Sequence, residues 1–199
     1  MQLVQWQFWT LELQFTLMAV ATWLALPSFL RSLHLSRRTC GTALVASLLA
    51  FVLTTAVAPR TNRIFYDEHI YQGIGQNLSD LRLAQMCNDC RVEYGHLECA
   101  QGEYNKQPYG YPYLLSVAYR ALGVHDWIAH GLNAVVNLLF VWVAVLLTIA
   151  LFSDVRASLF AGLASALIPQ QLLWGNTASA EPSAALTTAI AVLATVAFV

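Results

Sequence analysis

Charged residues are scarce in this chain of 199 residues. Only 11% of its residues are Asp, Glu, Lys or Arg, whereas a soluble globular domain carries about 25%. The formal net charge is −1, so the chain has no excess of one sign with which to bind nucleic acid or an acidic partner. Its length allows one domain and leaves no room for a large second one.

Several other signals are also missing. Gly73 and Gly75 follow no predicted strand and lack the third glycine of a dinucleotide-binding fingerprint. No internal repeat or low-complexity tract is visible. The first apolar segment is too long for a cleaved signal peptide, and no small-residue cleavage site follows it. These absences exclude a nucleotide-binding α/β domain, a repeat protein and a secreted soluble protein.

Long hydrophobic runs dominate what is present, because 58% of the residues are hydrophobic. A membrane span needs about 20 mostly apolar residues. The sequence predicts an all-α, polytopic transmembrane helix bundle that forms a single transmembrane domain over residues 1–199. The five predicted spans cover residues 8–30, 41–58, 127–152, 157–174 and 181–199. Because the last run ends without a polar flank, we expect the chain to be the N-terminal part of a longer protein.

The loops indicate an orientation in the membrane. Short basic loops tend to remain cytoplasmic, and the arginines of the short loops are Arg31, Arg37, Arg38 and Arg156. The long loop 59–126, which holds more than half of the charged residues, and Glu181 then lie on the extracytoplasmic side. We therefore expect an integral protein of a plasma or inner membrane.

The long loop is predicted to contain two interfacial helices, at 67–83 and 112–122. Apolar residues recur at helical spacing in the first, as in helices that lie along a membrane surface. Asp67 and Glu68 begin it. An acidic pair in this position commonly caps the helix and interacts favourably with its dipole. Alternatively, such a carboxylate takes a proton from a hydroxyl or holds a metal ion.

The order of the segments carries more information than any one of them. DEHIYQGIGQNL at 67–78 is followed by QPYGYPYLLSVAYRALG at 107–123, a span that begins near Trp127, an inner turn SDVRAS, and LFAGLASALIPQQLLWGNTASAEPSAALTTA. Over about residues 41–199 this succession resembles the N-terminal half of the GT-C glycosyltransferases. The similar members are the protein O-mannosyltransferases and the lipid A aminoarabinose transferases. The chain departs from them in the additional span within residues 1–30.

The resemblance implies transfer of a sugar from a polyprenyl-phosphate donor to a hydroxyl of a lipid, glycan or protein acceptor, on the extracytoplasmic side. Asp67 would be the catalytic carboxylate and Glu68 would support it. The candidate substrate-binding residues are Arg60, Arg63, Lys106, Tyr111 and Glu181. The cationic ones would neutralise the leaving phosphate. The resemblance assigns no cofactor, although a divalent metal ion is compatible with these carboxylates.

Three cysteines cluster in CNDCRVEYGHLEC. The spacing of Cys87, Cys90, His96 and Cys99 fits a zinc site. A loop in an oxidising compartment favours a disulfide instead, between Cys99 and either Cys87 or Cys90. Free thiols are the third alternative.

Two other functions compete with sugar transfer. A transporter or channel could line its path with Asp67 and Glu181, and a non-catalytic membrane subunit could bind a partner through a cysteine-stapled loop. Transporters place ionisable residues at mid-membrane or contain paired broken helices, whereas these acids lie at the outer edge. Within the spans, we expect Asn133 and Asn137 to hydrogen-bond a neighbouring helix and Glu12 to face protein or water.

Overall fold

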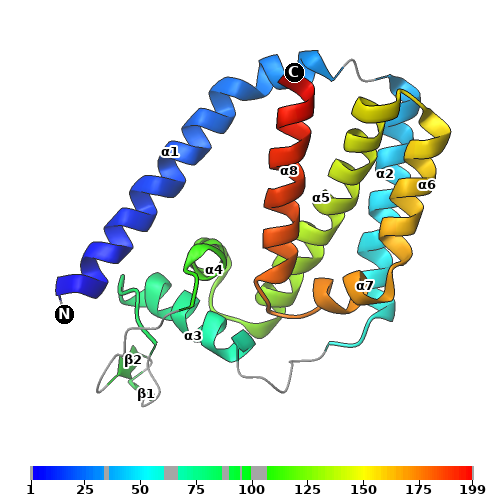
Figure 1. The fold of residues 1–199 in the computed structure, drawn as a ribbon. Helices are drawn as coiled ribbons and strands as arrows, with labels where there is room; N and C mark the ends of the chain where they lie inside the picture. Colours follow the sequence, from blue (N-terminus) through cyan, green and yellow to red (C-terminus); the bar gives the residue numbers. More distant parts are fainter. Residues whose placement is uncertain are drawn as a thin grey trace. The chain divides into compact units, whose positions relative to one another are not determined.

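The computed structural model describes residues 2–33, 36–60, 67–86, 90–94, 96–99 and 107–198. These residues are almost entirely helical, with one two-stranded antiparallel ribbon, so the predicted all-α class is confirmed in its main feature (Figure 1). The chain divides into two compact units. Unit 1 comprises Met1–Ala19, Asn62–Ala129 and Ala178–Ala180, and unit 2 comprises Val20–Thr61, His130–Thr177 and Glu181–Val199.

Most of the helices are long and apolar. Their bounds are α1 Gln2–Ser32, α2 Arg37–Val52, the π-helix η1 Leu53–Val57, α5 Asp126–Phe152, α6 Val155–Leu167, α7 Pro169–Gly175 and α8 Glu181–Phe198. Among the described residues, three stretches are long and apolar enough to cross a membrane: Leu3–Ser32, Arg37–Val57 and Asp126–Phe152. They correspond to the first three predicted spans, and they indicate that the chain is an integral membrane protein.

The other two predicted spans differ from expectation. Residues 157–174 do not form one straight helix, because α6 and α7 are bent by 61° relative to each other. The break is at Ile168, whose backbone is extended because it precedes Pro169. The apolar part of α8, Glu181–Ala197, is shorter than the three candidate spans. The described residues thus contain three candidate spans, or four if the bent pair counts as one.

Unit 2 is built around close contacts between helices. Figure 1 shows α2, α5, α6 and α8 running side by side. A buried layer of small residues joins α2, α5 and α6 and includes Ala43, Ala46 and Ala50, all fully buried. A Cβ atom at Gly162 on α6 would lie 2.6 Å from Val145 Cγ2 and 2.9 Å from the Ala46 Cβ. Without a hydrophobic effect between helices in lipid, such small residues let helices pack closely.

A buried polar network also belongs to unit 2. Asn137 on α5 donates from Nδ2 to Thr54 Oγ1 of η1 at 2.8 Å, which confirms the predicted bond to a neighbouring helix. Asn133 donates to the Thr177 carbonyl at 2.6 Å, and His130 Nδ1 donates to the Asn176 carbonyl at 2.9 Å. Asn176 in turn donates to the Ala58 carbonyl at 2.8 Å. The network therefore fixes the end of η1 and the segment after α7 to the first turns of α5.

Unit 1 is centred on two helices that are not candidate spans, α3 Asp67–Asp80 and α4 Gly110–Leu122. Both were predicted from the sequence, at 67–83 and 112–122. They approach closely at Gly75, where a Cβ atom would lie 3.2 Å from the Leu115 side chain. The unit 1 core consists of Phe8, Ile74, Leu78, Ala84 and Tyr113. The apolar stripe of α3 thus packs against protein, namely α4 and the first half of α1.

Glu12 of α1 faces protein within unit 1. Arg120 of α4 forms an ion pair with it at 2.5 Å, and the Tyr113 hydroxyl donates to its second carboxylate oxygen at 2.7 Å. Burial raises the pKa of Tyr113 above its usual value, and the hydrogen bond to Glu12 raises it further, so this hydroxyl remains a donor. The Glu12 carboxylate would be costly to place in lipid, and two side chains of α4 therefore compensate its charge.

Candidate functional site

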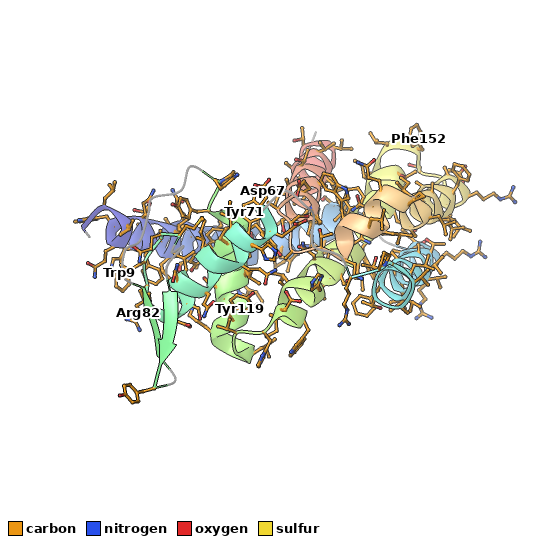
Figure 2. All side chains as sticks on the ribbon, turned by 90° about the horizontal axis from the view of Figure 1, so that it is seen from below. Trp9, Asp67, Tyr71, Arg82, Tyr119 and Phe152 are labelled. Carbon is orange, nitrogen blue, oxygen red and sulfur yellow. The ribbon has the colours of Figure 1, made fainter. Side chains whose placement is uncertain are left out.

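Asp67 begins α3 and its side chain is exposed. The helix dipole favours a carboxylate in this first turn. Gln107, just before α4, donates from Nε2 to Asp67 Oδ1 at 3.3 Å. Tyr71 lies one turn along α3 from Asp67 (Figure 2). Its hydroxyl donates to Gln107 Oε1 at 3.4 Å. The Gln107 amide thus links the predicted catalytic carboxylate to Tyr71 and orients it without burying it.

Glu68 has a different environment from its neighbour. It is 0% exposed, whereas Asp67 is exposed. Only Asp67 is therefore directly accessible to a substrate, and a supporting role of Glu68 would have to act from within the α3 packing. The predicted pair is thus an accessible carboxylate and a buried one, on consecutive residues of one helix.

Tyr111, a predicted substrate-binding residue, is 4% exposed. Its ring lies edge-on to the ring of Tyr71, with centroids 5.8 Å apart. It is therefore part of the packing between α3 and α4, where it supports Tyr71 and, through Gln107, the Asp67 carboxylate. This geometry favours an indirect contribution of Tyr111 over contact with a substrate.

The other predicted substrate-binding residues are placed separately. Arg60 belongs to unit 2 and is exposed. Arg63 and Lys106 lie outside the described residues. Glu181, also in unit 2, is the first residue of α8.

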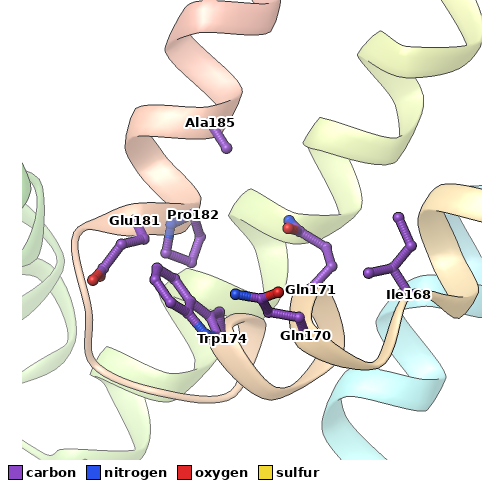
Figure 3. A pocket seen from close by; sticks show the side chains of 7 residues that line it. All are labelled: Ile168, Gln170, Gln171, Trp174, Glu181, Pro182 and Ala185. Atoms are coloured by element: carbon purple, nitrogen blue, oxygen red, sulfur yellow. The ribbon is translucent and has the colours of Figure 1, made fainter.

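Glu181 borders a cavity of about 220 Å³ within unit 2. Its wall combines the indole of Trp174 and the side-chain amides of Gln170 and Gln171 from α7 with Pro182 of α8 (Figure 3). Figure 3 shows the Glu181 carboxylate at the edge of this cavity, on the side away from Gln171. Gln171 donates to Asn137 Oδ1 at 2.9 Å, so the buried network holds one wall of the cavity. An aromatic face with converging amides suits a polar ring compound better than a purely apolar ligand.

The zinc alternative cannot be built from the described side chains. Cys87 lies outside the described residues, and Cys90, His96 and Cys99 are described by their backbone alone. Among the side chains that the structure describes, no group of three or more His, Cys, Asp or Glu residues is arranged to hold a metal ion. The zinc site stays a prediction.

The backbone of the ribbon bears on the disulfide alternative. Strands β1 Cys90–Glu93 and β2 His96–Cys99 pair so that Cys90 is opposite Cys99 and Glu93 is opposite His96. Only two residues connect the strands, and Tyr94 has the positive φ of 52° that a tight hairpin turn requires. If the pair closing such a turn is hydrogen-bonded, strict alternation makes the Cys90–Cys99 pair non-hydrogen-bonded, with Cα atoms about 4.5 Å apart. That spacing lies within the range of about 4.4–6.8 Å for disulfides.

We therefore expect Cys99 to be cross-linked to Cys90 and not to Cys87. Tryptic cleavage after Arg91 separates the two cysteines, so mass spectrometry of unreduced peptides measures the cross-link directly. The tryptic peptide that contains Cys90 also contains Cys87, so variants make the assignment. Cys87→Ser should keep the cross-link to the Cys99 peptide, and Cys90→Ser should abolish it. Loss of the cross-link in Cys87→Ser, or full thiol labelling of the unreduced wild type, would contradict the assignment.

Comparisons with known proteins add no family. No family model matches the chain, and no curated protein or solved structure is significantly similar to it.

Gln107, Gln170 and Gln171 were missed as candidate residues in the sequence. Gln107 directly precedes the Pro-Tyr-Gly-Tyr-Pro segment that leads into α4, and the pair Gln170–Gln171 interrupts an otherwise apolar run. Polar amides in those two settings were the available signal. Gln107 and Gln171 bond Asp67 and Asn137, which lie 40 and 34 residues away in the sequence, so spacing alone does not reveal the contacts.

Proposed function

We propose that this protein is a membrane glycosyltransferase that transfers a sugar from a polyprenyl-phosphate donor to an acceptor hydroxyl on the extracytoplasmic side of the membrane. The observation that carries the proposal is the exposed carboxylate of Asp67, which the Gln107 amide orients. Asp67 belongs to α3, which is not a candidate span but lies in the sequence between two candidate spans, Arg37–Val57 and Asp126–Phe152. The membrane helices would hold the lipid-linked donor nearby, and α3 would present the base to the acceptor.

The chemistry needs one proton acceptor and one group that stabilises an anion. The acceptor oxygen forms a bond to the anomeric carbon while the bond from that carbon to the phosphate oxygen breaks. The electron pair leaves with the polyprenyl phosphate, and the proton of the acceptor hydroxyl passes to Asp67. A cationic side chain close to the donor would stabilise the leaving phosphate. Direct displacement inverts the anomeric centre.

The cavity beside Trp174 fits the same proposal. Amide groups both donate and accept hydrogen bonds, as the hydroxyl groups of a sugar do, and the indole offers a flat apolar face to the ring. On the chemistry of unit 2 alone, we assign this cavity to a sugar ring.

Transport of a solute is the second candidate, and the broken helix pair α6–α7 is the observation that favours it. Against it, the acidic side chains described within the candidate spans are Glu12, which is paired with Arg120, and Asp126 at the start of α5. Neither is an unpaired charge at the centre of a span, where a transport site is expected.

One experiment separates the two candidates. The full-length protein, reconstituted in proteoliposomes, is given undecaprenyl phosphate that carries a radiolabelled sugar. We expect label to appear in an acceptor lipid, glycan or protein fraction, with release of an equal amount of undecaprenyl phosphate. Unaltered donor with movement of free sugar across the bilayer would instead establish transport and overturn the proposal.

A further inference from the structure

Two cavities lie at the arginine-rich end of unit 2, opposite the end that holds the polar network. The first has a volume of about 420 Å³ and is lined by residues from α1, α2, α5, α6 and α8 and their connections. Four hydroxyl side chains contribute to its wall: Ser32, Ser36, Thr39 and Ser153. Hydroxyl groups donate hydrogen bonds to phosphate and ester oxygens, so this cavity can receive a polar group.

The second cavity is an apolar groove of about 330 Å³ between α1, α5 and α8. On α1 it is lined by Thr22, Ala25, Leu26 and Phe29, and the other helices contribute aliphatic side chains. A groove of this composition suits a hydrocarbon chain.

The two cavities follow one another along the same three helices. Phe29 lines the groove and Ser32, three residues later, lines the polar cavity; Leu146 and Ile149 on α5 have the same relationship. From Thr22 to Leu33, a helical rise of about 1.5 Å per residue gives a length of roughly 16 Å. That is half of the hydrocarbon core, which is about 30 Å thick, so together the cavities match the depth of one leaflet.

The charged residues that adjoin the lining of the polar cavity in the sequence are mostly arginines. Arg37 and Arg38 lie between two of its lining residues, Ser36 and Thr39, and are exposed. Arg31 and Arg156 are also adjacent in sequence to lining residues and exposed, although the Arg31 Nε donates to the Pro27 carbonyl. The nearby carboxylate is Asp154, which caps α6 by accepting from the Arg156 amide. Among the described residues at this end there are thus four arginines and one aspartate, so the net charge is positive.

We propose that this end of unit 2 is a binding site for an anionic phospholipid of the leaflet on the arginine-rich side. The phosphate of the headgroup occupies the hydroxyl-lined cavity beside Arg37 and Arg38, and one acyl chain lies in the groove along α1. The acyl chain distinguishes this ligand from free phosphate, which shares the headgroup chemistry and has nothing to fill the groove. The site is independent of the proposed sugar transfer.

The test uses the full-length protein in a mild detergent, titrated with phosphatidylglycerol or phosphatidylcholine and followed by native mass spectrometry. We expect phosphatidylglycerol to bind at least tenfold more tightly, and millimolar inorganic phosphate to leave it bound. Equal binding of the two lipids would overturn the proposal. Displacement by inorganic phosphate would also overturn it, because it would show a site for the headgroup alone.

Two pairs of variants locate the site. Removing two cationic residues near a phosphate should weaken lipid binding roughly 30-fold, so Arg37→Gln with Arg38→Gln should lose phosphatidylglycerol while Arg37→Lys with Arg38→Lys retains it. Ala25→Phe fills the groove and should abolish binding of phosphatidylglycerol. Leu30→Phe adds the same ring at an exposed position of α1 outside the groove, and phosphatidylglycerol should still bind to it. Both positions are outside the buried core, so folding is preserved. Equal lipid binding by the two phenylalanine variants would exclude the groove.

Discussion

Replacing Asp67 by asparagine is expected to lower the rate of sugar transfer roughly 10²–10⁴-fold, the usual contribution of a positioned general base. Asparagine has nearly the same size and keeps an oxygen that can accept from Gln107, so α3 should remain folded. Only the ability to take a proton is removed. The measurement is the initial rate of sugar transfer from an undecaprenyl-phosphate donor by the full-length protein.

Asp80→Asn is the matched control. Asp80 is also an exposed carboxylate of α3, at its opposite end, and its replacement should leave the rate within about twofold of wild type. If Asp67→Asn keeps near-normal turnover, Asp67 is not the base. If both variants lose activity equally, the effect is one of charge on α3 and not of a particular carboxylate.

Gly162→Ala should destabilise unit 2 more than any other single-methyl addition at a described glycine. The new Cβ atom would lie 2.6 Å from Val145 Cγ2 and 2.9 Å from the Ala46 Cβ, and neither neighbour is the end of a flexible side chain. Overpacking of this kind typically costs about 1–3 kcal/mol. Alanine also gains about 1 kcal/mol of helix propensity over glycine, so the clash is measured against a matched Gly→Ala variant. At about 2–4 °C per kcal/mol, the Tm of Gly162→Ala in detergent should be several degrees lower than that of the matched variant.

Gly131→Ala on α5 provides the comparison. No atom lies within 4 Å of a Cβ placed there. Both substitutions gain about 1 kcal/mol of helix propensity, so the difference between their Tm values reports the clash alone. Equal Tm values would show that α6 does not approach α2 and α5 closely enough for a Cβ atom at position 162 to clash.

The hydrophobic runs were enough to predict the spans of α1, α2 and α5, because insertion into a bilayer depends on the summed apolarity of about 20 consecutive residues. The same reasoning did not predict the break within the span expected at 157–174. There the run is mostly apolar up to Ile168, and the break depends on the backbone restriction that Pro169 imposes on Ile168. The proline was visible in the sequence, but whether it kinks or breaks a helix depends on what surrounds it.

The two carboxylates at 67 and 68 show a second limit. Their position at the start of a helix was predictable from the end of one apolar run and the helical spacing of the next. Which of them is exposed was not, because it depends on the face that α3 turns toward α4 and α1. The structure exposes Asp67 and buries Glu68.

The sequence by itself determined that this is a helical membrane chain, where its long polar loop lies and which carboxylates begin α3, because these properties depend on neighbouring residues. Only the tertiary structure decided which distant groups meet: Arg120 with Glu12, 108 residues apart, Gln107 with Asp67, and Gly162 with Ala46. Such contacts depend on how whole helices pack, and the local periodicity of a single helix carries no information about its partner.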